Sequence, residues 1–189
     1  MTELDQLARE VRVSGRTLRR AAERGTFRMQ RPSRRKVVLP VEERVYLRAH
    51  WQLLGALVQT LRTQPNVRLA VLFGSIARGD SSPGSDLDVL VRLRRDDHRA
   101  RAELGDRLES ASGRRIQLVS LEQARQAPLL LGDVLRDGRV LVDRDRDWPG
   151  LQRQSRAITR RALEESVRLE RDAWRVPETL SETYRRARL

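Results

Sequence analysis

Two short apolar segments joined by a small polar loop constrain this chain of 189 residues more than any other feature. The first segment, residues 67–73, runs into Gly74 and Ser75, and the second begins after Asp86 and continues through Asp88. Both have the length and apolar content of buried strands. Because side chains alternate along a strand, residues two apart share a face. The two carboxylates are therefore expected to project side by side.

Two neighbouring carboxylates on an apolar strand need a positive partner, because burial and mutual repulsion both disfavour their charged forms. Mg²⁺ is the expected partner, since it binds one or two carboxylates together with phosphate oxygens and water. Gly74 lets a ligand approach the backbone, and Ser75 offers a hydroxyl. Residues 76–79 are expected to form a helical turn whose free N–H groups face a phosphate. The segment therefore predicts a site for a metal-bound nucleoside triphosphate.

This segment resembles the signature of the nucleotidyltransferase superfamily related to polymerase β, and most closely its small minimal nucleotidyltransferases. The matching positions are Gly74, Ser75, Arg78, Gly79, Ser85, Asp86 and Asp88. The resemblance implies an α/β (α+β) domain with a mixed sheet. It implies nucleotide binding by the first five of these residues, and metal binding and catalysis by Asp86 and Asp88. Mg²⁺ and ATP are the expected cofactors.

The resemblance also implies a third carboxylate, which completes a second metal site and serves as the base for the attacking hydroxyl. It should lie in the strand predicted over residues 115–119, where the best-matching position is Gln117. A glutamine amide oxygen can bind a metal, but it is uncharged and cannot act as a base. Glu109 and Glu122 fit the position poorly because they lie in predicted helices. The sequence therefore predicts nucleotide binding with impaired transfer.

Positive charge is concentrated in the N-terminal third of the chain. Residues 1–63 carry 14 basic and six acidic side chains, a net charge of +8 out of +13 for the whole chain. The net charge of residues 64–150 is +1 and that of residues 151–189 is +4. A local basic excess is the electrostatic footprint of a polyanion partner. A solvated basic surface without a partner is the alternative.

The same N-terminal third predicts two short helices, over 2–11 and 16–24, with Ser14 capping the second and Gly25 ending it. Two short strands, over residues 26–31 and 37–39, would follow as a wing around the basic turn of residues 32–36. The pattern resembles a winged helix–turn–helix domain that binds double-stranded DNA. Its predicted DNA contacts are Arg16, Thr17, Arg19, Arg20, Arg24, Arg34, Arg35 and Lys36. A small helical cap with a solvated surface is the alternative.

Four segments are therefore expected. They are a helix–turn–helix domain (1–40), a linking helix (41–63), a nucleotidyltransferase domain (64–150) and a C-terminal helical arm (151–189). One long helix is expected over about residues 148–174, and a last basic helix after Pro177. The linking helix either joins the two domains or pairs with its copy, and a homodimer is expected. The chain has no cysteine and no apolar run long enough to cross a membrane, so a cytoplasmic location is expected.

Two functions follow from these features. The first is a DNA-binding transcriptional regulator of the antitoxin type that binds Mg-NTP, with transfer activity possible but impaired by Gln117. The second is an active nucleotidyltransferase that moves a nucleoside monophosphate from NTP to a hydroxyl on a toxin protein, an RNA or a small molecule. Antitoxin-like members of this branch act on a partner toxin, so the resemblance implies a toxin partner. Gln117 and the basic N-terminal third favour the first function.

Overall fold

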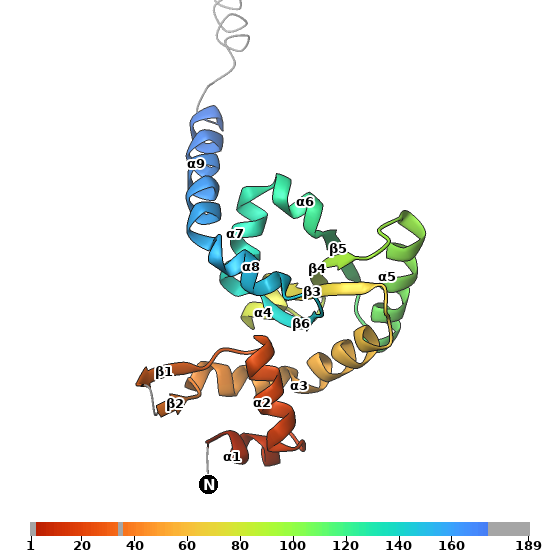
Figure 1. Ribbon diagram of the computed structural model, residues 1–189, viewed down its shortest axis with the longest axis vertical. Helices are drawn as coiled ribbons and strands as arrows, with labels where there is room; N and C mark the ends of the chain where they lie inside the picture. The colour runs from red at the N-terminus through yellow and green to blue at the C-terminus, as the bar shows by residue number, and fades with distance from the viewer. Residues whose placement is uncertain (1–2, 34–35, 174–189) are drawn as a thin grey trace, which may run out of the picture.

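The computed structural model describes residues 3–33 and 36–173, and it centres on a four-stranded sheet (Figure 1). The strand order is β5-β4-β3-β6, in which β3 pairs antiparallel with β4 and β6, while β4 and β5 are parallel. The strands are β3 (Val67–Phe73), β4 (Leu87–Leu93), β5 (Ile116–Ser120) and β6 (Arg139–Asp143). The predicted mixed sheet of an α/β domain is confirmed.

Helices cover both faces of this sheet. Ala70 and Leu72 of β3 point into one apolar core, which they share with α3 (Val41–Arg62) and α5 (His98–Ser112). Leu69 and Val71 point the other way. They pack with α6 (Leu121–Gln126), α7 (Pro128–Asp137), α8 (Asp147–Arg153) and the start of α9 (Ser155–Ala173). The alternation predicted for buried strands thus divides β3 between two cores.

The N-terminal elements are α1 (Glu3–Glu10), α2 (Gly15–Arg24) and a hairpin of β1 (Gln30–Ser33) and β2 (Lys36–Val38). The backbone N–H of Thr17 donates to Ser14 Oγ, and Gly25 ends α2 with a φ of +90°. Both caps are as predicted. The first strand begins later than expected, because Thr26 and Phe27 are buried and do not extend the hairpin.

The N-terminal elements dock onto β6 near its start. The backbone N–H of Val140 donates to the Gly25 carbonyl at 3.0 Å, and Thr26 Oγ1 donates to the Val140 carbonyl at 2.7 Å. One apolar core cluster runs from Leu7 and Leu18 through α3 to the sheet. The apolar stripe of α3 is therefore buried within this chain, which favours the linking role of α3 over pairing of this stripe with a second copy.

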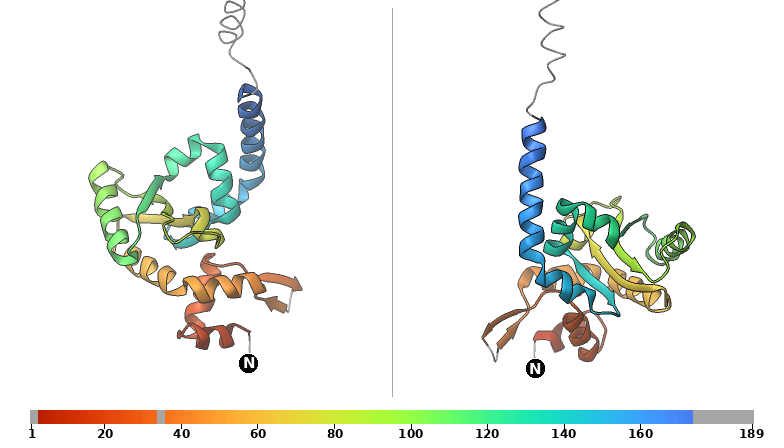
Figure 2. Two further views of the ribbon diagram at one scale, coloured as in Figure 1. Left: turned by 180° about the vertical axis from the view of Figure 1, so that it is seen from behind. Right: turned by 45° about the horizontal axis from the view of Figure 1, so that its top comes forward.

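The C-terminal arm differs from the single helix expected over residues 148–174. The chain turns at Gln154, so that α8 ends at Arg153 and α9 begins at Ser155. Helix α9 packs against α7 and then stands out from the layers of the domain (Figure 2). The final helix expected after Pro177 lies outside the described residues. None of the described helices combines the length and apolar character needed to span a membrane.

Candidate nucleotide site

The turn after β3 places Gly74 against Asp88. Phe73 at the end of β3 pairs with Asp88 on β4, and α4 (Gly74–Arg78) begins at the next residue. Gly74 has a φ of +74°, and a Cβ there would clash with Oδ2 of Asp88. Only glycine satisfies both conditions. The backbone of the predicted phosphate-binding turn therefore lies directly beside a predicted metal-binding carboxylate.

Asp86 and Asp88 occupy different electrostatic surroundings. Asp88 is half-buried, and its pKa is raised first by that burial and then by the charge of Asp86, while Arg78 opposes the shift. Asp86 is held by Arg115 at the start of β5, with Nε to Oδ1 at 2.9 Å and Nη2 to Oδ2 at 3.1 Å. A guanidinium thus already neutralises one of the two carboxylates, whereas the other lacks an ion-pair partner among the described residues.

Gln117 stands where the third carboxylate was sought. It pairs with Asp88 in the parallel register of β5 and β4, so the two side chains share one face of the sheet. Glu109 does not replace it, because its carboxylate accepts a hydrogen bond from the backbone N–H of Ile116 at 3.0 Å. Within residues 3–33 and 36–173, no three Asp, Glu, His or Cys side chains gather as a metal site. The donors fit one Mg²⁺ that shares phosphate oxygens, but not a second.

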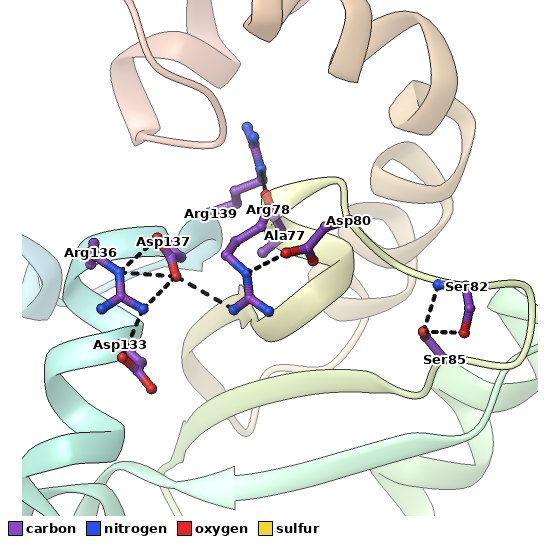
Figure 3. A network of polar contacts seen from close by, with 9 residues as sticks. All are labelled: Ala77, Arg78, Asp80, Ser82, Ser85, Asp133, Arg136, Asp137 and Arg139. Carbon is purple, nitrogen blue, oxygen red and sulfur yellow. Dashed lines mark hydrogen bonds and ion pairs between the residues drawn. The ribbon is translucent and has the colours of Figure 1, made fainter.

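The remaining predicted nucleotide contacts divide into two groups. Ser75 lies in the first turn of α4, and its hydroxyl makes no hydrogen bond to another described residue. Gly79 ends α4 with a φ of +90°. Ser85 accepts a hydrogen bond from the backbone N–H of Ser82 at 2.9 Å, which closes the loop before β4 (Figure 3). Ser75 is therefore available to a ligand, while Ser85 shapes the loop.

Arg78 belongs to a chain of ion pairs at the end of α4 (Figure 3). Its Nε lies 3.0 Å from Asp80 Oδ2, and its Nη1 lies 3.6 Å from Asp137 Oδ2. Asp137 is buried at the end of α7 and also pairs with Arg136 at 3.0 Å. A phosphate that binds Arg78 would have to compete with these two carboxylates.

A buried arginine at the start of β6 donates a hydrogen bond to α4. Arg139 Nε donates to the carbonyl of Ala77 at 2.6 Å, and its guanidinium pairs with Glu43 of α3. The same guanidinium lies 3.4 Å from the centre of the Tyr46 ring. Burial raises the pKa of Tyr46 to about 12, and its hydroxyl has no hydrogen-bond partner among the described residues. None of these residues was predicted, and the only sequence signal was a charged residue opening an apolar strand.

The N-terminal elements reach the same network. Glu43 Oε1 also accepts a hydrogen bond from the backbone N–H of Arg28 at 3.2 Å. The Arg28 guanidinium in turn donates to the carbonyl of Arg136, which neighbours Asp137. Arg28 is therefore hydrogen-bonded both to Glu43, the partner of Arg139, and to the residue next to Asp137, the partner of Arg78.

Four of the five predicted DNA contacts on α2 are exposed to solvent. Arg16, Thr17, Arg19 and Arg20 are exposed, and Arg19 forms an ion pair with Asp5 of α1 at 3.0 Å. Arg24 is half-buried and donates from Nε to Thr26 Oγ1 at 3.2 Å. Lys36 opens β2, while Arg34 and Arg35 lie outside the described residues.

Comparison with known proteins agrees with this geometry. The profile of the family described as polymerase beta, nucleotidyltransferase matches residues 56–147, which contain β3, α4, β4 and Gln117. Residues 56–147 are therefore similar to nucleotidyltransferases of the polymerase β kind, and the mixed sheet matches the nucleotidyltransferase fold. No curated protein matches the chain.

Several solved structures that are similar to this chain come from toxin–antitoxin systems. One, a toxin–antitoxin with AMP-PNP, has a chain 26% identical, with a TM-score of 0.52 over 64% of this chain and 97% of that chain. A mutant of the MntA–HpeT toxin–antitoxin gives 26% identity and a TM-score of 0.51 over 63% and 95%. The tri-AMPylated Shewanella oneidensis HEPN toxin in complex with the MNT antitoxin gives 24% and 0.50 over 66% and 98%, and shows the shared fold.

Proposed function

We propose that this protein is an antitoxin-type regulator that binds Mg-ATP at its nucleotidyltransferase domain and DNA through its N-terminal elements, with nucleotidyl transfer weak or absent. The observation that carries the proposal is the pairing of Asp88 with Gln117, which puts an amide where a base is required. Asp86, Asp88 and the Gln117 amide oxygen would hold one Mg²⁺, which supplies positive charge against the triphosphate.

Nucleotide binding has its own support. Gly74 leaves the backbone of α4 open beside Asp88, and the Ser75 hydroxyl is free to accept or donate a hydrogen bond. A similar chain, 26% identical, comes from a toxin–antitoxin crystallised with AMP-PNP. ATP is therefore the nucleotide we propose.

The test compares binding with transfer. Wild type, Asp86→Ala/Asp88→Ala and Gln117→Asp are incubated with Mg²⁺, labelled ATP and the purified product of the neighbouring reading frame, with Gln117→Asn as the neutral control. We expect wild type to bind ATP, and Gln117→Asp alone to transfer label above background. Transfer by wild type that is lost in the double alanine variant would refute the impaired-transfer proposal.

That outcome would establish the second candidate, an active nucleotidyltransferase. The intact contact of Gly74 with Asp88 favours it. In this reaction an acceptor hydroxyl oxygen attacks the α-phosphorus of ATP and pyrophosphate leaves. The hydroxyl proton would pass to water or to the phosphate, because Gln117 cannot accept it.

DNA binding is supported by the exposed arginines of α2 and by the net charge of the N-terminal third. The test is a salt-titrated shift assay with the DNA upstream of the protein's own gene. Arg16→Ala/Arg19→Ala/Arg20→Ala should weaken binding and flatten its salt dependence. Arg94→Ala/Arg107→Ala/Arg125→Ala removes the same charge from the nucleotidyltransferase domain and serves as the control. Equal binding by both triple variants would refute the assignment.

A protein partner is supported by α9 and by the similarity to toxin–antitoxin structures. Leu163 and Val167 lie one turn apart on one face of α9 and are 65% and 47% exposed. We propose that this face binds the toxin, or a second copy in a homodimer. Leu163→Glu/Val167→Glu should abolish co-purification with the toxin, or change the mass in solution, and Glu164→Gln is the control.

A further inference from the structure

A basic groove lies between α2 and α3, and it shares no lining residue with the nucleotide site. It encloses about 410 Å³. Arg20 and Arg24 line it from α2, and Trp51, Gly55 and Arg62 line it from α3. Its volume falls within the range of small-molecule sites in proteins.

The charge in this groove is unbalanced. Three guanidinium groups line it, and no carboxylate does. Among the described residues, Arg20, Arg24 and Arg62 form no ion pair, whereas Arg48 on the same helix pairs with Glu10 at 2.9 Å. The pKa of Arg24 is lowered, first by burial and then by the charge of Arg62. Clustered cations in a partly buried groove are unfavourable until an anion neutralises them.

Gly55 leaves the floor of the groove open. A glycine inside a helix costs roughly 1 kcal/mol relative to alanine. Packing does not require it here, since a Cβ at this position would meet nothing within 4 Å. Trp51 lies one turn earlier on the same face of α3 and is half-buried. Gly55 therefore lines the groove together with one aromatic side chain and three cations.

We propose that this groove binds a nucleotide unit, with its phosphate held by Arg24 and Arg62 and its base against Trp51 over Gly55. Guanidinium groups bind phosphate by paired charge-assisted hydrogen bonds, and tryptophan stacks on any base. The unit comes either from a free nucleotide or from a nucleic-acid strand. In the second case the strand must present an unpaired base to Trp51, and the inference rests on the proposed DNA binding, which it extends to single strands.

The test fills the groove without changing its charge. Gly55→Phe places a ring on the groove floor, and Gln52→Phe places the same ring on an exposed site of α3 outside the groove. Arg24→Gln/Arg62→Gln removes two charges without filling it, with Arg107→Gln/Arg125→Gln as the matched control. All variants carry Asp86→Ala/Asp88→Ala, so that the other site does not contribute. The probes are ATP in EDTA and a fluorescein-labelled single strand of the upstream DNA. The duplex is measured beside them as the control for DNA binding by α2.

We expect Gly55→Phe and Arg24→Gln/Arg62→Gln each to weaken binding of at least one probe by tenfold or more, and both controls to stay within twofold. Loss confined to ATP identifies a free nucleotide, and loss confined to the single strand identifies a nucleic-acid strand. Unchanged binding of both probes by either groove variant would overturn the inference. If Arg16→Ala/Arg19→Ala/Arg20→Ala loses the duplex while both groove variants keep both probes, DNA binding stands and the groove site falls. The inference would also be overturned if the protein with an intact groove bound neither of the two probes.

Discussion

Arg139 of β6 and Glu43 of α3 form a buried ion pair directly beneath α4, although 96 positions separate them in the chain. Arg139 also donates to the carbonyl of Ala77, the fourth residue of α4. Through Glu43, α3 therefore supplies one member of the ion pair that contacts the predicted phosphate-binding turn. The predicted nucleotide site is thus in contact with a pair whose acidic member precedes the whole nucleotidyltransferase signature.

Loss of one partner of this pair should destabilise the fold. Glu43→Leu leaves the Arg139 charge buried, and removal of one member of such a pair costs about 3–5 kcal/mol. The double variant Glu43→Leu/Arg139→Met replaces both charges with apolar groups and should recover most of that loss. Its affinity for Mg-ATP should stay reduced, because the Ala77 carbonyl has lost its donor. Urea unfolding and calorimetric titration measure the two effects, and full recovery of both would argue against a positioning role.

Tyr46 offers a change in the opposite direction. Its hydroxyl is buried and has no hydrogen-bond partner in residues 3–33 and 36–173. Tyr46→Phe therefore removes a desolvated polar group and keeps the ring over which the Arg139 guanidinium lies. We expect the variant to gain up to about 1 kcal/mol in the free energy of unfolding. Tyr46→Ala should instead lose about 3–5 kcal/mol, because it empties a buried ring site. A loss of stability in Tyr46→Phe would show that the hydroxyl has a partner in solution.

Gly74→Ala should damage both fold and binding. The positive φ alone disfavours an L side chain by roughly 1–2 kcal/mol, and the added Cβ would push Asp88 aside. We expect a lower melting temperature and no measurable Mg-ATP binding. Gly84→Ala, in the same loop region, is the matched control because a Cβ there meets nothing within 4 Å. Comparable losses in the two variants would mean that the contact with Asp88 is not what requires Gly74.

The sequence predicted what is encoded locally. The spacing of apolar residues marked α3 and β3 at their observed limits, and Gly25 marked the end of α2. The signature also led to Gln117, which pairs with Asp88 in the observed register. Each of these depends on a residue and its near neighbours, or on a motif whose spacing fixes a register.

Contacts between distant segments were not predictable. The sequence does not show that Arg115 forms an ion pair with Asp86, or Arg139 with Glu43. Those contacts depend on which strands and helices become neighbours. The break at Gln154 was missed for a related reason. Neither glycine nor proline stands at that position, and the turn allows α9 to pack on α7. Tertiary packing overrides local helix propensity there.

The two carboxylates should respond differently to neutralisation. The pKa of Asp88 is raised in the folded protein, so its ionised form is disfavoured by folding. This cost is absent below the ordinary pKa of 3.8, grows as the pH rises to the raised pKa, and is fully present above it. Asp88→Asn should therefore melt at a higher temperature than wild type at pH 7, and the difference should close toward pH 3.5. The same variant should lose Mg-ATP binding, because the site needs a charged ligand.

Asp86→Asn is the matched control, because Arg115 already neutralises Asp86 and no gain in melting temperature is expected from its removal. Thermal melts of wild type and both variants between pH 3.5 and 7 measure the difference. For wild type, affinity for Mg-ATP should also fall as the pH drops through the raised pKa of Asp88, since protonation removes the charge that binds the metal. Equal melting shifts in the two variants at pH 7 would show that the ionised Asp88 carboxylate does not lower the stability of the fold.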